Sequence, residues 1–192
     1  MPHLYIISGC NGAGKTTASL TILPDILDCR EFVNADNIAF GISPFNVEGV
    51  AIEAGRIMLR RIDELLVQKA DFAIETTLAT RSYVSLVKKA KQEGYQVTLL
   101  YIWLNSPELA RQRVAERVRK GGHNIPRAVI ERRYYKGIQN FFRLFQPICN
   151  TWILADNSFG VLQIIAQGED GFVNLIGNDD LWAVVNKQCN GS

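Results

Sequence analysis

Residues 9–16 have the residue types and the spacing of a phosphate-binding loop. They read Gly-Cys-Asn-Gly-Ala-Gly-Lys-Thr and match the pattern G-x-x-x-x-G-K-[ST] in full. Glycines in such a loop let backbone N–H groups approach phosphate oxygens, and the following helix directs its positive end at the same anion. We expect Lys15 to reach the β- and γ-phosphates of ATP and the Thr16 hydroxyl to bind Mg²⁺. The residues expected to bind the nucleotide are Gly9, Cys10, Asn11, Gly12, Ala13, Gly14, Lys15, Thr16, Thr17, Arg113 and Asn157.

Two carboxylates follow predicted strands, where active sites of parallel sheets lie. Asp36 comes about twenty residues after the loop, and we expect it to be the catalytic base, with a second role in binding Mg²⁺ through water. The alternative is that Asp36 caps a helix or turn in residues 34–37. Glu75, with Thr76 and Thr77, is expected to bind the substrate or Mg²⁺.

A basic segment at residues 111–133 is predicted to form a lid over the phosphates. It holds eight Lys and Arg residues against two Glu, so its net charge is +6 while the rest of the chain is −4. Arginines stabilise the charge of a phosphoryl group during transfer, and Arg113, Arg117 and Arg133 are the candidates. We expect Arg117 and Arg133 to be catalytic. The alternative is a solvated helix face, and His123 either touches phosphate or caps a loop.

Strands that alternate with helices predict an α/β doubly wound parallel sheet, the fold of P-loop NTPases. Apolar spacing or capping residues predict five helices. They run from residue 15 to about 23, from the end of a loop at 40–47 to about 68, over 82–93, from 106 to 121 and over 126–145. Residues 40–47 contain Gly41, Pro44 and Asn46 and are expected to be a loop. Five strands are predicted, over residues 4–7, 31–34, 72–74, 97–104 and 151–154.

The tail differs from this alternation. Residues 161–167 and 172–176 are predicted to form a β-hairpin with an Asp-Gly turn. We expect residues 1–158 to form the kinase-like domain with its lid, and residues 159–192 to be a hairpin appendage packed on it, outside the main sheet.

The bulk composition is that of a soluble globular protein. The 192 residues are 47% hydrophobic and 21% charged, and no apolar run is long enough to span a membrane. The first residues lack a signal-peptide pattern, so we expect a cytoplasmic protein. The four cysteines are not at metal-ligand spacing, and Cys10 is interpreted as a small side chain in the loop.

Four motifs in this order resemble the zeta toxin family of P-loop kinases. They are G-C-N-G-A-G-K-T at 9–16, N-A-D at 34–36, E-T-T at 75–77 and G-G-H-N-I-P at 121–126, within a likeness that covers roughly residues 4–157. The resemblance implies a phosphotransferase with a helix-flanked parallel sheet. It implies that Asp36 is the catalytic base, that Glu75 and Thr77 bind the substrate, and that arginines of the lid contact phosphates. The best-understood members phosphorylate UDP-N-acetylglucosamine and are held inactive by a small antitoxin.

The leading hypothesis is therefore an ATP- and Mg²⁺-dependent kinase that acts on a small hydroxyl-bearing acceptor such as a nucleotide sugar. A second hypothesis is an RNA or nucleotide kinase, which the basic segment and the interleaved Tyr134, Tyr135, Phe141 and Phe142 suggest. Their helical spacing is more typical of a core than of a nucleic-acid surface. A third hypothesis is a nucleotide-binding regulatory module whose partner protein senses its ATP state.

Overall fold

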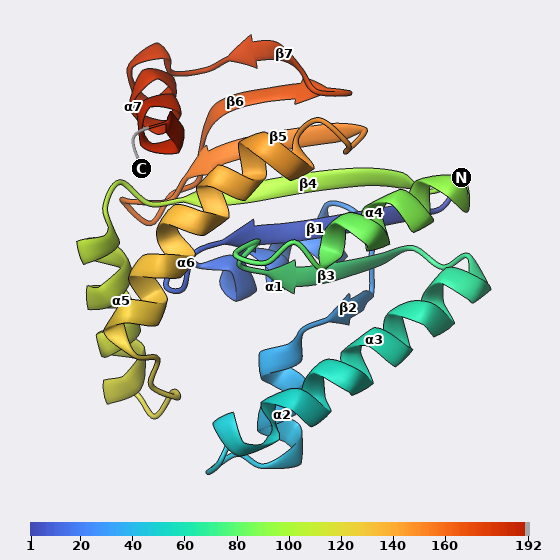
Figure 1. Cartoon of the computed structure of the whole chain (residues 1–192), viewed down its shortest axis with the longest axis vertical. Coiled ribbons are helices and arrows are strands. Elements are labelled where there is room, and N and C mark those ends of the chain that lie inside the picture. The colour runs from blue at the N-terminus through green and yellow to red at the C-terminus, as the bar shows by residue number, and fades with distance from the viewer. Residues whose placement is uncertain (191–192) are drawn as a thin grey trace.

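The computed structural model describes residues 1–190 and shows one twisted sheet with helices on both faces (Figure 1). Its strands are β1 (His3–Gly9), β2 (Glu31–Val33), β3 (Phe72–Thr76), β4 (Gln96–Trp103), β5 (Thr151–Asp156), β6 (Gln163–Glu169) and β7 (Phe172–Ile176). The α-helices are α1 (Lys15–Asp25), α2 (Ala35–Ile42), α3 (Ala51–Gln68), α4 (Tyr83–Gln92), α5 (Pro107–Arg119), α6 (Arg127–Asn140) and α7 (Asp179–Asn190). A 3₁₀ turn (Glu48–Val50) precedes α3, and a π-helical turn (Phe141–Phe145) follows α6.

The strand order is β2-β3-β1-β4-β5-β6-β7. The first five strands are parallel, as predicted, and β1 lies between β3 and β4. This arrangement brings the carboxyl ends of β1, β2 and β3 to one edge of the sheet. The phosphate loop, Asp36 and Glu75 follow or lie at those ends, so the topology places them together.

The C-terminal hairpin forms around Asp170 and Gly171, both at positive φ, as an Asp-Gly turn requires. Its position corrects the expectation of an appendage outside the main sheet. Strand β6 pairs antiparallel with the whole of β5, and β7 pairs with β6. The sheet therefore continues across the boundary expected at residue 158.

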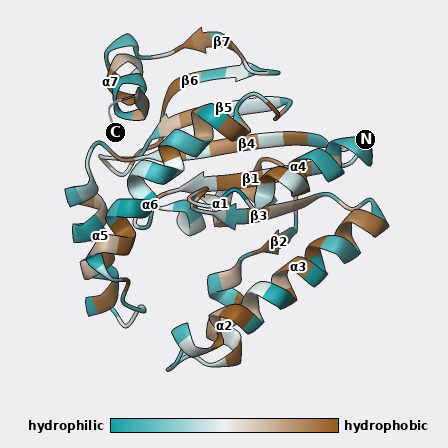
Figure 2. Ribbon diagram, in the orientation of Figure 1, coloured by the Kyte–Doolittle hydropathy of each residue, from teal (hydrophilic) through white to brown (hydrophobic). Residues whose placement is uncertain are grey.

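Two hydrophobic clusters hold the layers together, one on each face of the sheet. The first packs α3, α4 and α7 against it, through side chains such as Met58, Val87 and Val185. The second packs α1 and α5 against the other face, through side chains such as Leu23 and Val114. Figure 2 shows hydrophobic residues along the central strands that both clusters share.

Two helices were not predicted. Residues 35–42 form α2 instead of entering a loop at residue 40, because Asn34 caps the helix and Gly41 is tolerated near its end. The tail after the hairpin forms α7, where the Asn178 side chain accepts a hydrogen bond from the N–H of Leu181. Among residues 1–190, no helix combines the length and hydrophobicity that a membrane span requires.

Candidate active site

The phosphate loop connects β1 to α1 and ends at the N-terminus of that helix. Gly9 has φ 142°, and a Cβ there would collide with the carbonyl oxygen of Ile102. Gly14 has φ 89° and directly precedes α1, whose N-terminus no side chain of the described residues caps. The amides of this helix end are therefore free to bind phosphate.

Cys10 lies buried in the wall of this loop. Burial raises the pKa of its thiol to about 11, although the positive charges of Lys15 and Arg113 act in the opposite direction. At neutral pH Cys10 is therefore a neutral thiol, which agrees with its interpretation as a small packing side chain.

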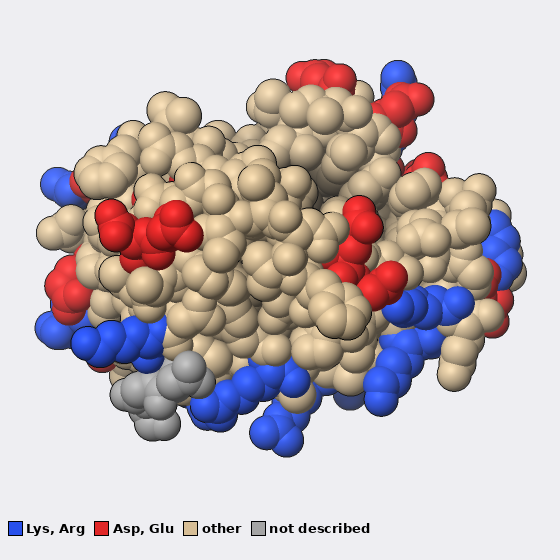
Figure 3. All heavy atoms as spheres, turned by 90° about the horizontal axis from the view of Figure 1, so that it is seen from above, with Lys and Arg blue, Asp and Glu red and all other residues tan. Residues whose placement is uncertain are grey.

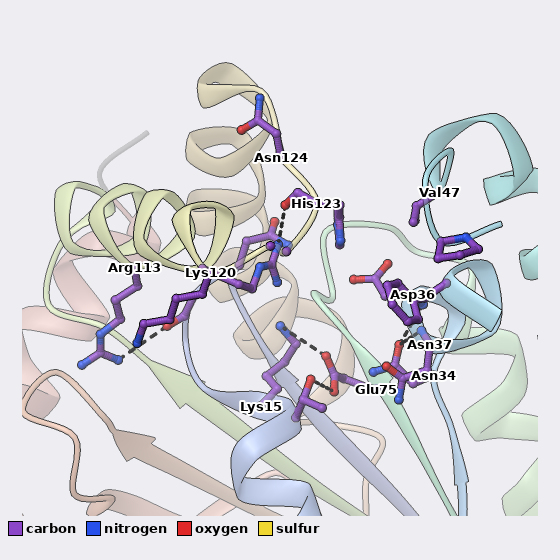
Figure 4. Close-up of a pocket in the computed structure, with 18 of the residues that line it drawn as sticks. Lys15, Asn34, Asp36, Asn37, Val47, Glu75, Arg113, Lys120, His123 and Asn124 are labelled. Carbon is purple, nitrogen blue, oxygen red and sulfur yellow. Dashed lines mark hydrogen bonds and ion pairs between the residues drawn. The ribbon is translucent and has the colours of Figure 1, made fainter.

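Glu75 at the end of β3 contacts Lys15 and Thr16 of the loop (Figure 4). The Thr16 hydroxyl donates a hydrogen bond to Glu75 Oε2 at 2.8 Å, and Lys15 Nζ lies 3.8 Å from Glu75 Oε1. Lys15 also donates to the Cys10 carbonyl oxygen at 3.1 Å. The register explains this contact, because Glu75 pairs with Ile7, two residues before the loop begins. A hydroxyl and a carboxylate oxygen side by side are the hard donors that Mg²⁺ prefers, so these residues fit the ion.

Asp36 lies in the first turn of α2 but does not cap it. The Asn34 side-chain oxygen accepts hydrogen bonds from the N–H groups of Asp36 at 2.8 Å and Asn37 at 3.3 Å. The alternative in which Asp36 is the cap is therefore wrong. Its carboxylate instead points into the cavity above the phosphate loop (Figure 4).

This cap gives a first prediction. Asn34→Ala is expected to lower the free energy of unfolding by about 1 kcal/mol, because it leaves two N–H groups of α2 without their acceptor. Asn34→Ser, which retains a capping oxygen, is expected to lose less. Urea unfolding followed by circular dichroism measures both, and equal stability of Asn34→Ala and wild type would contradict the capping role.

Arg113 and Asn157 join the phosphate loop to the segment after β5. Arg113 donates to the carbonyl oxygens of Asn157 at 2.8 Å and Ser158 at 2.9 Å, and more weakly to that of Gly12 at 3.5 Å. The Asn157 side-chain amide donates to the Ala13 carbonyl oxygen at 2.8 Å. Both residues therefore contact the phosphate loop. Their binding of the nucleotide stays a prediction.

The two lid arginines expected to be catalytic come from different helices, and Arg133 is not among the described residues that line the cavity. Arg117 of α5 lines the cavity and donates to the His123 carbonyl oxygen at 3.3 Å. Arg133 of α6 donates to Asn11 Oδ1 of the phosphate loop at 3.1 Å. Burial lowers the pKa of Arg133, and the nearby Asp36 carboxylate partly offsets this effect. The guanidinium stays charged at neutral pH, because an ordinary arginine has its pKa far above 7.

Two other basic residues of the segment, Arg111 and Arg127, form ion pairs. Arg111 forms ion pairs with Glu108 and Glu131, and Arg127 pairs with Glu131 as well. The segment is therefore divided between a helix-to-helix ion-pair network and the cavity. Some of its basic residues therefore fit the alternative of a helix face outside the site, and others lie at the cavity as expected of a lid.

The cavity has a volume of about 1110 Å³ and lies between the phosphate loop, α2 and the lid. A pocket for one drug-sized ligand measures roughly 300–1,000 Å³, so this space suits a nucleotide together with a second molecule. Thr76 and Thr77 are not among the described residues that line it, and the Thr76 hydroxyl accepts a hydrogen bond from the Leu78 N–H.

Several lining residues were missed in the sequence. The wall opposite the lid comes from the end of α2 and the segment that follows, and it includes Phe40, Phe45 and Glu48. On the lid side, Glu116 of α5 and Lys120 directly after that helix line the cavity as well. The residues of the opposite wall were missed because Gly41 and Pro44 led us to predict a loop over residues 40–47, where the structure has the end of α2.

The four aromatic residues lie in α6 and in the π-helical turn after it, and they do not form a nucleic-acid surface. Tyr134 and Phe141 are buried, and Phe142 packs partly buried against the main core. Tyr134 donates a hydrogen bond to the Leu104 carbonyl oxygen at 2.7 Å. Only Tyr135 of the four is exposed, so the helical spacing correctly indicated a core.

The mostly parallel sheet, with a phosphate loop at the carboxyl ends of its strands, has the fold of a P-loop kinase. The sequence model described as Zeta toxin matches residues 1–156 of the chain. The chain therefore belongs to the zeta toxin family.

Three comparisons illustrate this relationship. An uncharacterized protein of Haemophilus influenzae (strain ATCC 51907 / DSM 11121 / KW20 / Rd) is 33% identical over 126 residues, which are 66% of this chain and 88% of that protein. A chain of the AvrRxo1-ORF1:AvrRxo1-ORF2 crystal structure has a TM-score of 0.81 at 18% identity, and the match covers 98% of this chain. It covers 64% of that chain, so the protein spans less than two thirds of this structural relative.

The third is a structure from the PezAT chromosomal toxin-antitoxin system of Streptococcus pneumoniae. Its TM-score is 0.73 at 18% identity, and the match covers 100% of this chain and 80% of that one. At these identities the structural likeness shows the shared fold.

Proposed function

We propose that the protein is an ATP- and Mg²⁺-dependent kinase that phosphorylates a hydroxyl group of a small acceptor. The observation that carries the proposal is the single cavity that holds both the phosphate loop and the Asp36 carboxylate. Family membership supports it, and so does a similarly folded crystal structure, that of AvrRxo1-ORF1:-ORF2 with ATP.

In the proposed reaction the acceptor oxygen forms a bond to the γ-phosphorus of ATP while the bond from that phosphorus to the β,γ-bridging oxygen breaks. Asp36 accepts the proton of the acceptor hydroxyl and orients its oxygen. Lys15 and the free amides of α1 hold the phosphates, and Arg117 and Arg133 stabilise the charge of the group in transfer. Thr16 and Glu75 would hold Mg²⁺, with Asp36 acting through water, and the bound ion would supply positive charge beside the phosphates.

We further propose a UDP-N-acetyl sugar as the acceptor, because that is the substrate that the family resemblance implies. Glu75 lines the cavity in which such an acceptor would bind, with Thr76 and Thr77 next in the chain. The similarity to a structure from a toxin-antitoxin system supports a small antitoxin as a protein partner. We propose that both act in the cytoplasm.

Transfer of radiolabelled γ-phosphate from ATP to a bacterial metabolite extract tests the proposed reaction. A labelled small molecule is expected with wild type, and adding UDP-N-acetylglucosamine is expected to increase one product. Label in RNA instead would favour a polynucleotide kinase. If ATP binds and no acceptor is labelled, the proposal fails and a regulatory nucleotide-binding module becomes the better account.

A second prediction concerns Glu75, whose carboxylate lies 3.8 Å from the Lys15 ammonium group. Glu75→Gln is expected to bind Mg²⁺-free ATP about tenfold more tightly, because it removes a negative charge beside the phosphates and releases Lys15. With Mg²⁺ present this gain is expected to disappear, because the ion loses a negatively charged partner.

Titration of a fluorescent ATP analogue with EDTA and with Mg²⁺ measures both affinities. Glu53→Gln, on the exposed side of α3, is the control for the loss of one negative charge. A variant that weakens binding equally under both conditions would contradict a role of Glu75 at the metal.

A further inference from the structure

Strand β7 ends the sheet with an exposed hydrophobic surface that the proposed reaction does not use. All five of its residues are exposed, with Phe172 at 76% and Leu175 at 50% of their full accessible area. Its sequence, Phe-Val-Asn-Leu-Ile, has four apolar residues and no charge. Figure 2 shows this strand as hydrophobic, and at the top of Figure 1 nothing in residues 1–190 lies beyond it.

An open strand edge of this kind is normally protected. Its unpaired N–H and C=O groups can pair with another strand, and proteins block this with charged side chains, proline or bulges. A register shift between Gln167 and Gly168 places one extra residue, Asn174, on β7, but the five residues of the strand contain no charge and no proline. Figure 3, seen from this side of the molecule, shows charged side chains around a broad uncharged area.

We propose that β7 pairs with β7 of a second copy of this chain, antiparallel and about a two-fold axis, to form a dimer with one continuous sheet. The strand is complementary to itself about Asn174. In such a pair Phe172 faces Ile176 of the other copy, Val173 faces Leu175, and Asn174 faces Asn174. Aromatic and β-branched side chains opposite one another stabilise antiparallel pairs, and two amides can exchange hydrogen bonds.

Charge favours a second copy over a different protein. A symmetric pair places each residue near its own equivalent, so a charge at the centre of the strand would repel itself. The uncharged sequence of β7 avoids that repulsion. It offers no charge to recognise a partner of opposite sign.

The available area indicates a weak dimer. From their exposed fractions, the four apolar residues of β7 and Ile164 of β6 offer about 500 Å² per copy, which gives about 1,000 Å² for the pair. This lies at the lower limit for a specific interface, so the dimer is expected to dissociate on dilution. Because the contact is apolar, it is expected to persist at high salt.

Sedimentation of the full chain across a concentration series tests the proposal. Wild type is expected to shift from monomer to dimer, and Asn174→Lys or Asn174→Asp alone is expected to remain monomeric. A mixture of these two variants is expected to recover the dimer, because opposite charges then meet at the two-fold axis. Val67→Lys, on an exposed site of α3 far from β7 in Figure 1, is expected to dimerise like wild type.

A cross-link tests the register. Asn174→Cys is expected to form a disulfide-linked dimer under mild oxidation, whereas Val67→Cys is not, and the four native cysteines are buried. Because Asn174 is exposed and its side chain packs in no core, each variant is expected to fold. Circular dichroism checks this. A wild type that stays monomeric at all concentrations overturns the proposal. So does a dimer that Asn174→Lys retains or that high salt dissociates.

Discussion

Asp36→Asn is expected to lower the rate of γ-phosphoryl transfer by about 10²–10⁴-fold, which is the contribution of a positioned general base. An amide of the same shape accepts no proton from the acceptor hydroxyl at neutral pH. The affinity for ATP is expected to stay within a few-fold of wild type, because the phosphate loop and Arg113 are unchanged. The loss should therefore appear in kcat.

The structure makes this test informative because Asn34, not Asp36, caps α2. Substitution of Asp36 should leave the helix intact, so the free energy of unfolding is expected to change little. Asp25→Asn, at an exposed site in the last turn of α1, is the matched control and should keep full activity. Full activity in Asp36→Asn would remove the proposed base and leave Asp36 as a residue of the cavity wall.

The phosphate loop was predictable because its chemistry is local. Eight consecutive residues specify it, and Gly9 and Gly14 take a positive φ, which glycine adopts without strain. Glu75 was predictable in part. The alternation of strands and helices indicated a parallel sheet, but only the pairing of β3 with β1 places Glu75 against Thr16.

The lid could be predicted as a segment and not as individual contacts. All its arginines lie in one basic stretch, yet Arg111 and Arg127 pair with Glu131 while Arg133 turns to Asn11. Which direction each side chain takes depends on how α5 packs against α6, a long-range contact that local sequence does not encode. The same limit applies to the hairpin, whose strands were predicted but whose pairing with β5 was not.

Lys15→Met is the second large expected effect, and it separates catalysis from stability. Loss of the ammonium group is expected to lower the transfer rate by about 10²–10³-fold, because a preorganised cation no longer meets the charge on the phosphates. The protein is also expected to lose about 1 kcal/mol of unfolding free energy, since the Glu75 carboxylate at the cavity wall loses the cation 3.8 Å away while keeping its hydrogen bond from Thr16.

The double variant Lys15→Met with Glu75→Gln resolves the two effects. It removes both charges of the pair, so urea unfolding should show most of the lost stability restored, whereas transfer should stay as low as in Lys15→Met or fall further. If stability is not restored, the ion pair between Lys15 and Glu75 does not stabilise the phosphate loop. If transfer returns with stability, the effect of Lys15→Met on rate came from a distorted loop, and the cation would no longer be needed to explain catalysis.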